Sequence, residues 1–318
     1  MLSYKNIQKL VIALAAFLFS YILLGYYSYG DQIFYKRLYE AFKTAHLSEV
    51  MGLGLLHVSG AEPITLHLLW VGAAVEIEKN IFISIFNAIL IYCLVVLLEK
   101  NKAPFYIYIL LLTNFYVIVL LTGAERLKFA YIFFILAAIS TSKLYRFSFL
   151  ALSPLSHFQA LIYFPSLILH HISADLRRLL SLFITVKLIR IVFLFIFLLV
   201  IISLFKFGEI VAKAQVYIAE NANFIELTNL TILFLIAMSA TRYKARMVLV
   251  HLPLFPAVFL LGGERVNMIA VSLVIYFLLI EQRLSKPLPL LLLLYFSMQS
   301  IFFVYNIIQY GDGFYKLK

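Results

Sequence analysis

The chain is a succession of long apolar stretches separated by short breaks that hold most of the charged residues. A helix needs about 20 apolar residues to cross the hydrocarbon core of a bilayer. Apolar stretches that we interpret as spans lie near 7–28, 81–98, 104–122, 127–141, 189–206, 229–241, 247–261, 266–281 and 288–306. The pattern predicts an all-α, polytopic integral membrane protein that forms a single transmembrane domain over residues 1–318.

The composition agrees with this prediction. Hydrophobic residues make up 64% of the chain and charged residues 13%, and the mean hydropathy is +1.01. A soluble domain has about 25% charged residues, so too little polar surface is present here to cover a water-soluble globule. This excludes a cytosolic enzyme, a secreted disulfide scaffold and a disordered regulator. The single cysteine, Cys93, lies within an apolar stretch and is interpreted as an inert buried thiol.

The formal net charge of +11 has two explanations. It could attract nucleic acid, but the chain has no Lys/Arg-rich run and no soluble basic domain. In a membrane protein, an excess of Lys and Arg in the cytoplasmic loops explains the same charge. We therefore expect no nucleic-acid partner.

Two apolar pieces do not fit a simple crossing. Ile64–Val75 has the length of a helix of only about 18 Å, too short for a core of about 30 Å, so we expect it to be re-entrant. Residues 147–170 are long enough to cross once, but Pro154 and a polar group around His157 interrupt them. This segment could form two short spans that meet near His157.

The positive-inside rule chooses between these arrangements. With the N-terminus in the cytoplasm and 147–170 split in two, the basic loops at Lys100–Lys102, Arg177–Arg178 and Arg242–Arg246 all lie inside. Treating 147–170 as one crossing would move the last of these loops outside. We therefore predict about eleven transmembrane helices, within a range of nine to twelve, plus the short re-entrant helix, with the C-terminus outside.

Three breaks on the predicted outer face share a form: Gly60-Ala61-Glu62-Pro63, Gly123-Ala124-Glu125-Arg126 and Gly262-Gly263-Glu264-Arg265. Each places two small residues and a carboxylate at the start of a helix. Charges this close to hydrocarbon are costly and tend to face a water-filled cavity or a partner. The alternative is that they are interfacial anchors, with the carboxylate favoured by the helix dipole.

Two longer outer segments, 29–62 and 207–228, are predicted to form amphipathic helices on the membrane surface. In the first, Phe34, Leu38, Phe42 and Ala45 recur at helical spacing, and Asp31 is either a functional carboxylate or a helix cap. The second offers amide and carboxylate side chains of the kind that bind sugar hydroxyls.

Known catalytic and cofactor motifs are not found. The sequence has no HExxH, no paired cysteines, no Walker glycine loop and no GxSxG, so we expect neither a metal nor a cofactor. His157 is either a hydrogen-bonded core histidine or a functional one, and His170-His171 is interpreted as interfacial.

Taken in order, the outer motifs resemble those of the bacterial polysaccharide polymerases of the O-antigen and exopolysaccharide type. In that family an outer Asp is followed by a Tyr four residues later, as at Asp31 and Tyr35. A Glu-Pro then opens a short helix, as at Glu62-Pro63. Downstream come an Arg at the outer start of a span and a His that closes an apolar run, here Arg126 and His157. The family's usual Arg-Gln pair is absent, because Leu127 follows Arg126.

The resemblance implies a membrane glycosyltransferase of the GT-C-like class in the bacterial inner membrane. It would join undecaprenyl-diphosphate-linked oligosaccharide repeat units on the periplasmic face without a metal, and membrane lipid and a chain-length regulator protein would be its partners. Three sets of residues are implied. The base is one of His157, Glu62 and Asp31, the diphosphate is bound by Arg126, Arg265 and Lys128, and the glycan is bound by Tyr35, Tyr217 and Glu264.

The residue types suit this chemistry. A guanidinium is permanently charged and can hold phosphate by two hydrogen bonds, and a positioned base makes a sugar hydroxyl more nucleophilic. A nearby arginine would weaken a carboxylate as a base, which argues for His157. Two other functions stay open: a lipid-linked glycan ligase or other membrane glycosyltransferase, and a transporter or flippase without chemistry.

Overall fold

The computed structural model describes residues 4–173 and 223–315, and within these ranges every regular element is a helix. The chain divides into two compact units, which are considered one at a time. The first comprises residues 1–160 and 291–318, and the second comprises residues 161–290. All residues of the site described below belong to the first unit.

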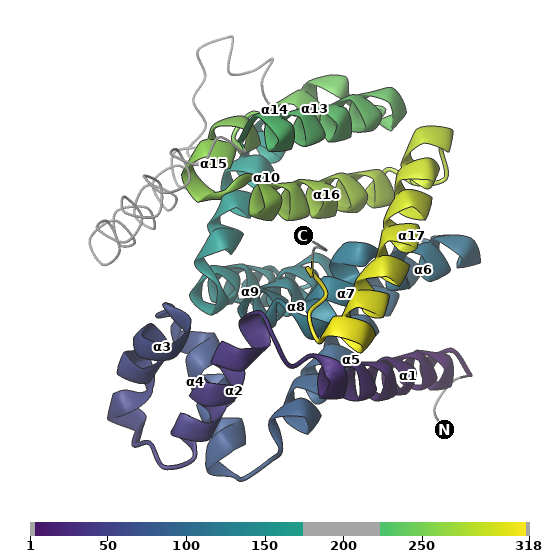
Figure 1. The fold of residues 1–318 in the computed structure, drawn as a ribbon. Coiled ribbons are helices and arrows are strands. Elements are labelled where there is room, and N and C mark those ends of the chain that lie inside the picture. Colours follow the sequence, from purple (N-terminus) through teal and green to yellow (C-terminus); the bar gives the residue numbers. More distant parts are fainter. Residues whose placement is uncertain (1–3, 174–222, 316–318) are drawn as a thin grey trace. The chain divides into compact units, whose positions relative to one another are not determined.

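The first unit contains helices from both ends of the chain (Figure 1). They are α1 (Tyr4–Tyr26), α2 (Asp31–Phe42), the short 3-10 helix η1 (Leu47–Glu49), α3 (Val50–Val58), α4 (Pro63–Ala74), α5 (Lys79–Lys100), α6 (Phe105–Leu112), α7 (Phe115–Thr122), α8 (Glu125–Ile139), α9 (Lys143–Ser156) and most of α17 (Pro287–Tyr310). The 3-10 helix η2 (Phe158–Ile162) follows α9 at the boundary between the units.

The second unit contains the described helices α10 (Tyr163–Ser173), α13 (Asn223–Ala240), α14 (Lys244–His251), α15 (Leu254–Leu261) and α16 (Gly263–Ile280). Ser166 of α10 donates a hydrogen bond to the carbonyl of Val250 in α14. The carboxylate of Glu281 accepts hydrogen bonds from Thr241 and from the backbone of Arg242. These bonds fix the turn between α13 and α14 to the end of α16.

Several helices can span a membrane. In the described residues, four are long and apolar enough: α1 from Asn6 onward, α5, α16 and α17. The pair α6 and α7 adds a fifth if the two helices, bent by 49° at a break, form one broken span. The described part of the chain is therefore all-helical with four or five apolar helices able to cross a bilayer, whereas eleven crossings stay a prediction. The expected span at 189–206 lies outside the described residues.

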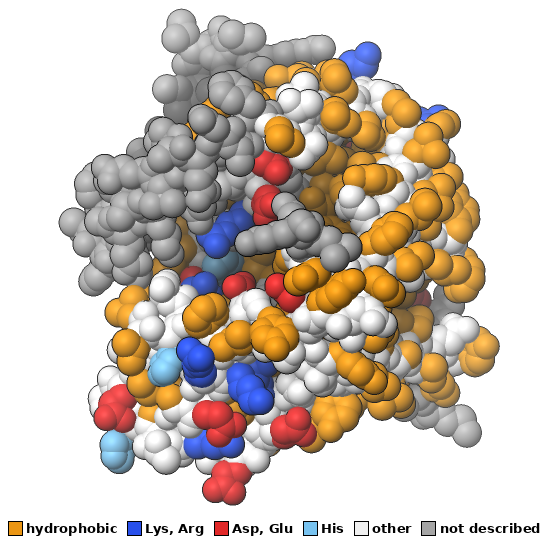
Figure 2. Space-filling view, in the orientation of Figure 1, with side chains coloured by type: hydrophobic (Ala, Val, Ile, Leu, Met, Phe, Trp, Pro, Cys, Tyr) orange, Lys and Arg blue, Asp and Glu red, His pale blue; other side chains and the backbone are white. Residues whose placement is uncertain are grey.

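The surfaces of α1 and α17 support a lipid-facing position. Large apolar side chains are exposed along both helices, among them Leu14 and Ile22 on α1 and Ile301 and Phe302 on α17. In Figure 2 hydrophobic side chains cover the region of α17, whereas charged side chains gather over α2 and α3. Apolar side chains left without a protein neighbour over a whole helix indicate contact with lipid.

Helix α2 is amphipathic, but its buried face differs from the expected one. Leu38 and Phe42 are buried as predicted, whereas Phe34 is 48% exposed and Tyr35 takes its place in the core. This face packs on a cluster that includes Leu66 of α4. The expectation that α2 rests its apolar face on lipid is therefore wrong, because other helices of the same unit cover that face. Most of the second expected amphipathic segment, 207–228, lies outside the described residues.

The two unusual apolar pieces form short helices. Pro63–Ala74 is the 12-residue helix α4, with proline in its first turn, where the missing N–H is not needed. The segment 147–170 breaks at His157, whose backbone is extended between α9 and η2. Pro154 lies inside α9 and cannot donate a helical hydrogen bond, and the helix ends two residues later. The expected break is confirmed, while re-entrance of α4 stays a prediction.

Candidate active site

A polar cluster forms in the first unit where the starts of α4 and α8, the end of α9 and one face of α2 meet. Glu62 precedes α4, Arg126 lies in the first turn of α8, His157 follows α9, and Tyr35 projects from α2. Because Pro63 disfavours a helical conformation at the preceding residue, the backbone of Glu62 is extended and its side chain departs from the axis of α4. The sequence predicts that Glu62 shares a cavity with Arg126, Arg265 and His157. The structure brings Glu62, Arg126 and His157 together, whereas Arg265 belongs to the second unit, so its part in the cavity stays a prediction.

Two hydrogen bonds between helix faces place these side chains. The hydroxyl of Thr65 in α4 donates to the carbonyl of Ser156 at 2.8 Å, one residue before His157. The hydroxyl of Ser153 in α9 donates to the carbonyl of Ala130 in α8 at 3.0 Å. All three helices are thus tied to one another within one or two turns of the cluster.

Arg126 is held on two sides. Its Nε donates to the hydroxyl of Tyr35 at 2.9 Å, and its Nη1 lies 3.2 and 3.0 Å from the two carboxylate oxygens of Glu62. No hydrogen bond to Nη2 is found within the described part of the chain. The side chain is 19% exposed, so one edge of a permanently charged guanidinium can still bind an anion.

His157 shares the same carboxylate. Its Nδ1 lies 2.9 Å from Oε1 of Glu62, and its Nε2 lies 3.0 Å from Oε1 of Gln159. An ionised Glu62 accepts only, so Nδ1 has the proton and donates. In the neutral imidazole, Nε2 is then an acceptor, and the amide of Gln159 must turn its NH₂ group toward it, an exchange of O and N that the geometry allows equally.

The charge states follow from the surroundings. Burial alone would raise the pKa of the Glu62 carboxyl, but the hydrogen bond from His157 and the charge of Arg126 outweigh it and lower this pKa to about 2. Burial also lowers the pKa of His157 below its usual 6.5, and this outweighs the opposing hydrogen bond and charge of Glu62. At neutral pH the site therefore holds an ionised Glu62 and a neutral His157.

Tyr35 stays protonated in this setting. Burial raises the pKa of its hydroxyl to about 12, although the charge of Arg126 opposes the shift. Its oxygen accepts from Arg126, so its own hydrogen can be donated to another group. The position suits the expected role in binding a hydroxyl-rich ligand.

Glycine at position 60 makes room for the pair of Arg126 and Glu62. A Cβ atom there would overlap Nη1 of Arg126 and press on Oε2 of Glu62. The first small residue of the Gly-Ala-Glu motif therefore has a local steric reason.

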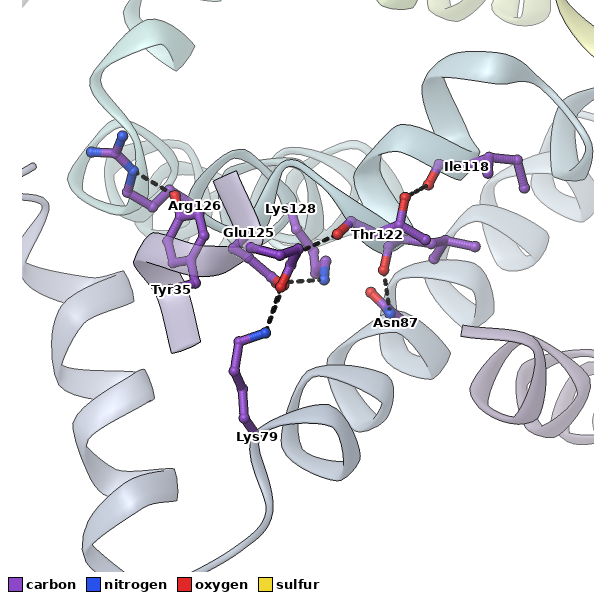
Figure 3. A network of polar contacts seen from close by, with 10 residues as sticks. Tyr35, Lys79, Asn87, Ile118, Thr122, Glu125, Arg126 and Lys128 are labelled. Atoms are coloured by element: carbon purple, nitrogen blue, oxygen red, sulfur yellow. Dashed lines mark hydrogen bonds and ion pairs between the residues drawn. The ribbon is translucent and has the colours of Figure 1, made fainter. Parts of the chain in front are cut away.

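A second polar cluster lies beside the first, on the other face of the start of α8. Glu125 is fully buried and accepts from Nζ of Lys128 at 2.9 Å and from Nε2 of Gln32 at 2.9 Å, while Nζ of Lys79 lies at 3.9 Å. Gln32 also donates to the carbonyl of Thr122 and accepts from Lys79. Figure 3 shows Arg126 directed to Tyr35 and Lys128 directed to Glu125, on opposite sides of the helix.

The position of Lys128 does not support its expected role in binding diphosphate. Its side chain is completely buried and its ammonium is paired with Glu125. In a helix Lys128 lies three residues after Glu125 and two after Arg126, so it shares a face with Glu125 and not with Arg126.

The remaining expected site residues are less closely associated. Asp31 is exposed in the first turn of α2 and contributes to the electrostatics of Tyr35, but no hydrogen bond joins it to Glu62, Arg126 or His157. Glu264 and Arg265 are exposed at the start of α16 in the second unit, so their convergence with Arg126 stays a prediction. Tyr217 lies outside the described residues.

Sequence reasoning missed Gln159, Gln32, Glu125 as a buried anion, and Lys79. Gln159 had a detectable signal, because it follows His157 by two residues in a break that already contained polar groups. Lys79 had none, because it reaches Glu125 only through the packing of α5 and α8. Among the described residues, no group of three His, Cys, Asp or Glu side chains could hold a metal ion.

Comparison with known proteins gives no match. No family model, no curated protein and no solved structure is significantly similar to the chain. A functional assignment therefore depends on the chemistry of the site and on the resemblance of its short motifs.

Proposed function

We propose that the protein is a membrane glycosyltransferase that uses a lipid-linked diphosphate donor, and within that class a polysaccharide polymerase of the bacterial inner membrane. The observation that supports it is the sharing of one carboxylate, Glu62, between a histidine and an arginine. This arrangement combines a base with a fixed positive charge, the two groups that transfer of a sugar from diphosphate to a hydroxyl requires.

In the proposed step, a hydroxyl of the acceptor glycan attacks the anomeric carbon of the donor. The new C–O bond forms as the bond from that carbon to the diphosphate oxygen breaks. The hydroxyl proton moves to Nε2 of His157, which Glu62 keeps in the correct tautomer through Nδ1. The leaving diphosphate gains negative charge, which Arg126 stabilises through its open edge.

This assignment distinguishes the three candidate bases. Glu62 is a weak base, because Arg126 and His157 hold its pKa near 2, and Asp31 has no bond to the cluster. His157 has a carboxylate behind it and a lone pair at Nε2, which in the structure accepts from Gln159 and which the acceptor hydroxyl must take over from that amide. It is therefore the base in the proposal, with Glu62 as the residue that positions it. Tyr35 donates to a sugar or phosphate oxygen.

The test uses a strain of the source bacterium that lacks the gene, restored with the wild type or with His157→Gln, and displays the surface polysaccharide on a gel. The wild type should give a ladder of chain lengths, and His157→Gln should give only single repeat units at normal protein level. His57→Gln, a histidine of α3 outside the cluster, is the matched control and should give the full ladder.

Other outcomes identify the other functions. If the protein is a ligase, its inactive variant would leave long chains attached to the lipid carrier, because polymerisation would continue without transfer to the final acceptor. If the protein is a flippase, its inactive variant would leave no repeat units on the outer face. A full ladder from His157→Gln would contradict the proposed base.

A further inference from the structure

The shared carboxylate has a consequence for ligand binding. Arg126 and His157 both bond to Glu62, and each has one nitrogen that faces away from this carboxylate: Nη2 on the arginine, and Nε2 on the histidine, which is hydrogen-bonded to Gln159. In the structure the positive charge of Arg126 is balanced by Glu62. An anion that binds Arg126 therefore competes with Glu62 for that charge. It also changes the electrostatic potential at His157.

We infer that the diphosphate product is held at Arg126 together with a proton on His157, so that its binding takes up a proton and its departure releases one. This inference rests on the proposed function and names the chemistry of the released ligand, a lipid-linked or free diphosphate. The proton is the one that the acceptor hydroxyl gives to Nε2 during transfer.

The groups that face His157 determine the direction of the effect. They are Glu62 before α4, Arg126 of α8 with Tyr35 of α2 behind it, and Gln159 of η2. Glu62 favours the imidazolium form and Arg126 opposes it. A bound diphosphate neutralises Arg126 and adds negative charge, and both changes raise the pKa of His157.

The same competition limits how tightly the product is held. The carboxylate of Glu62 lies within hydrogen-bond distance of the guanidinium that the diphosphate must reach, so it repels the incoming anion. When the anion leaves, Glu62 again neutralises the charge of Arg126. Glu62 thus has two opposed effects: it stabilises the proton on His157 and weakens the grip of Arg126 on the ligand.

Linkage gives the measurable quantity. If one extra proton is bound with each diphosphate, the affinity for diphosphate falls about tenfold for each unit rise in pH across the range in which His157 titrates. Reciprocally, bound diphosphate raises the affinity of His157 for its proton. Diphosphate itself titrates near neutral pH, so the proton count must be taken as the difference between the wild type and a variant without the imidazole.

The experiment is isothermal titration calorimetry on the full chain in lipid nanodiscs at pH 7, in two buffers with different ionisation enthalpies. The probes are farnesyl diphosphate and inorganic pyrophosphate. We expect the wild type to take up close to one more proton per bound diphosphate than His157→Gln. Farnesyl diphosphate binding more tightly than pyrophosphate, with the same proton difference, would identify a lipid-linked source. Equal affinities would identify free diphosphate.

Glu62→Gln separates the two effects of the carboxylate and does not depend on the behaviour of His157→Gln. Its amide keeps the size and can bond to both neighbours, but it has no charge to stabilise the imidazolium or to repel the ligand. We expect the extra proton to disappear and the affinity for both probes to rise about tenfold at pH 8. Weaker binding by Glu62→Gln would overturn the competition.

The failures are distinguishable. Equal proton counts in the wild type and His157→Gln, with normal binding, would overturn this inference and leave the proposed function intact. Binding of neither probe to the wild type would overturn both, because the anion site itself would be absent. Arg126→Gln should abolish binding of both probes. If this variant still binds them, the anion binds at another site.

Discussion

Two carboxylates are paired with residues of the first turn of α8 but lie in different environments: Glu125, which begins α8, is paired with Lys128, and Glu62, which precedes α4, is paired with Arg126. Glu125 is closed in: its side chain is 1% exposed, Lys128 at 0% is paired with it, and Gln32 and Lys79 complete its surroundings. Glu62 is open: its partners Arg126 and His157 are 19% and 13% exposed, and each has a nitrogen that points away from the carboxylate.

The difference separates a structural role from a functional one. A buried charge cluster whose members are satisfied by one another can hold helices together, but it has no capacity for a ligand. A cluster that is satisfied inwardly and still has a donor and an acceptor directed outward can bind and react. We propose the first role for Glu125 and the second for Glu62, although both belong to Gly-Ala-Glu motifs of the same form.

The largest effect should come from the arginine of the open cluster. Arg126→Ala removes the only cation bonded to Glu62 in the described structure and is expected to lower transfer by about 10³-fold. Arg126→Lys should recover part of this, because a lysine keeps the charge but loses the fork. The measurement is the rate of glycan transfer by purified protein.

Lys128→Met is the matched control in the closed cluster. It removes a cation two residues away that contacts Glu125 and no ligand, so transfer should stay within about tenfold of the wild type. If Lys128→Met is as inactive as Arg126→Ala, the two clusters do not differ in role and the comparison fails.

The two carboxylates should respond in opposite ways to the same substitution. Glu125→Gln leaves the buried ammonium of Lys128 without its anion and removes a second, partly buried charge contact with Lys79. Loss of a buried partner typically costs about 3 kcal/mol or more, and should lower the Tm by about 5–10 °C. Glu62→Gln should change the Tm by less than about 3 °C but lower transfer about 10²-fold, because His157 loses the charge that supports it.

The expected changes in Tm and in transfer rate are checked by thermal unfolding in nanodiscs and by transfer assays on the same preparations. The double variant Glu125→Gln with Lys128→Met should recover part of the lost Tm, since it also removes one unpaired ammonium. A large loss of Tm in Glu62→Gln with normal transfer would reverse the two assignments.

The sequence predicted the open cluster better than the closed one, for a physical reason. Glu62, Arg126 and His157 each stand at a break that the local pattern marks: a proline after the carboxylate, small residues before the arginine, and a proline inside the run before the histidine. Breaks in apolar helices are recognisable from sequence and expose side chains that depart from the helix axis.

The closed cluster depends on tertiary packing. Gln32 and Lys79 belong to α2 and α5, and nothing in their own segments indicates that they meet at Glu125. Lys128 was recognisable by its spacing of three residues from Glu125. The shift of the buried face of α2 from Phe34 to Tyr35 had the same origin, because the bond from Arg126 holds Tyr35 inward.

A smaller effect should come from the glycine that lets Arg126 approach Glu62. In Gly60→Ala the new methyl group overlaps the guanidinium, and the pair must move apart. We expect transfer to fall about tenfold with little change in Tm. Gly52→Ala in α3, where a Cβ meets nothing within 4 Å, is the control and should behave as the wild type. Equal rates for the two variants would show that the pair tolerates displacement.

The smallest effect should come from Gln159. When His157 is protonated, its Nε2–H can donate to the amide oxygen of Gln159, and this bond raises the pKa of His157, although burial outweighs it and the net shift from 6.5 is downward. Transfer requires the neutral imidazole, so the rate in the wild type should fall only at a pH below the usual pKa of a histidine. In Gln159→Ala the fall should begin at a still lower pH, and transfer at pH 7 should stay close to that of the wild type. The pH profile of kcat/KM measures the shift, and a shift to higher pH would contradict it.

In the proposed function, the open cluster transfers a sugar from a lipid diphosphate with His157 as the base. Its most direct test is a single-turnover assay in lipid vesicles, with purified protein, a polyprenyl-diphosphate-linked oligosaccharide as donor and acceptor, and mass spectrometry of the products. The account predicts one doubled oligosaccharide and one released polyprenyl diphosphate per turnover with the wild type, and a rate at least 10²-fold lower with His157→Gln. Transfer at the wild-type rate by His157→Gln, or no doubled product from the wild type, would contradict it.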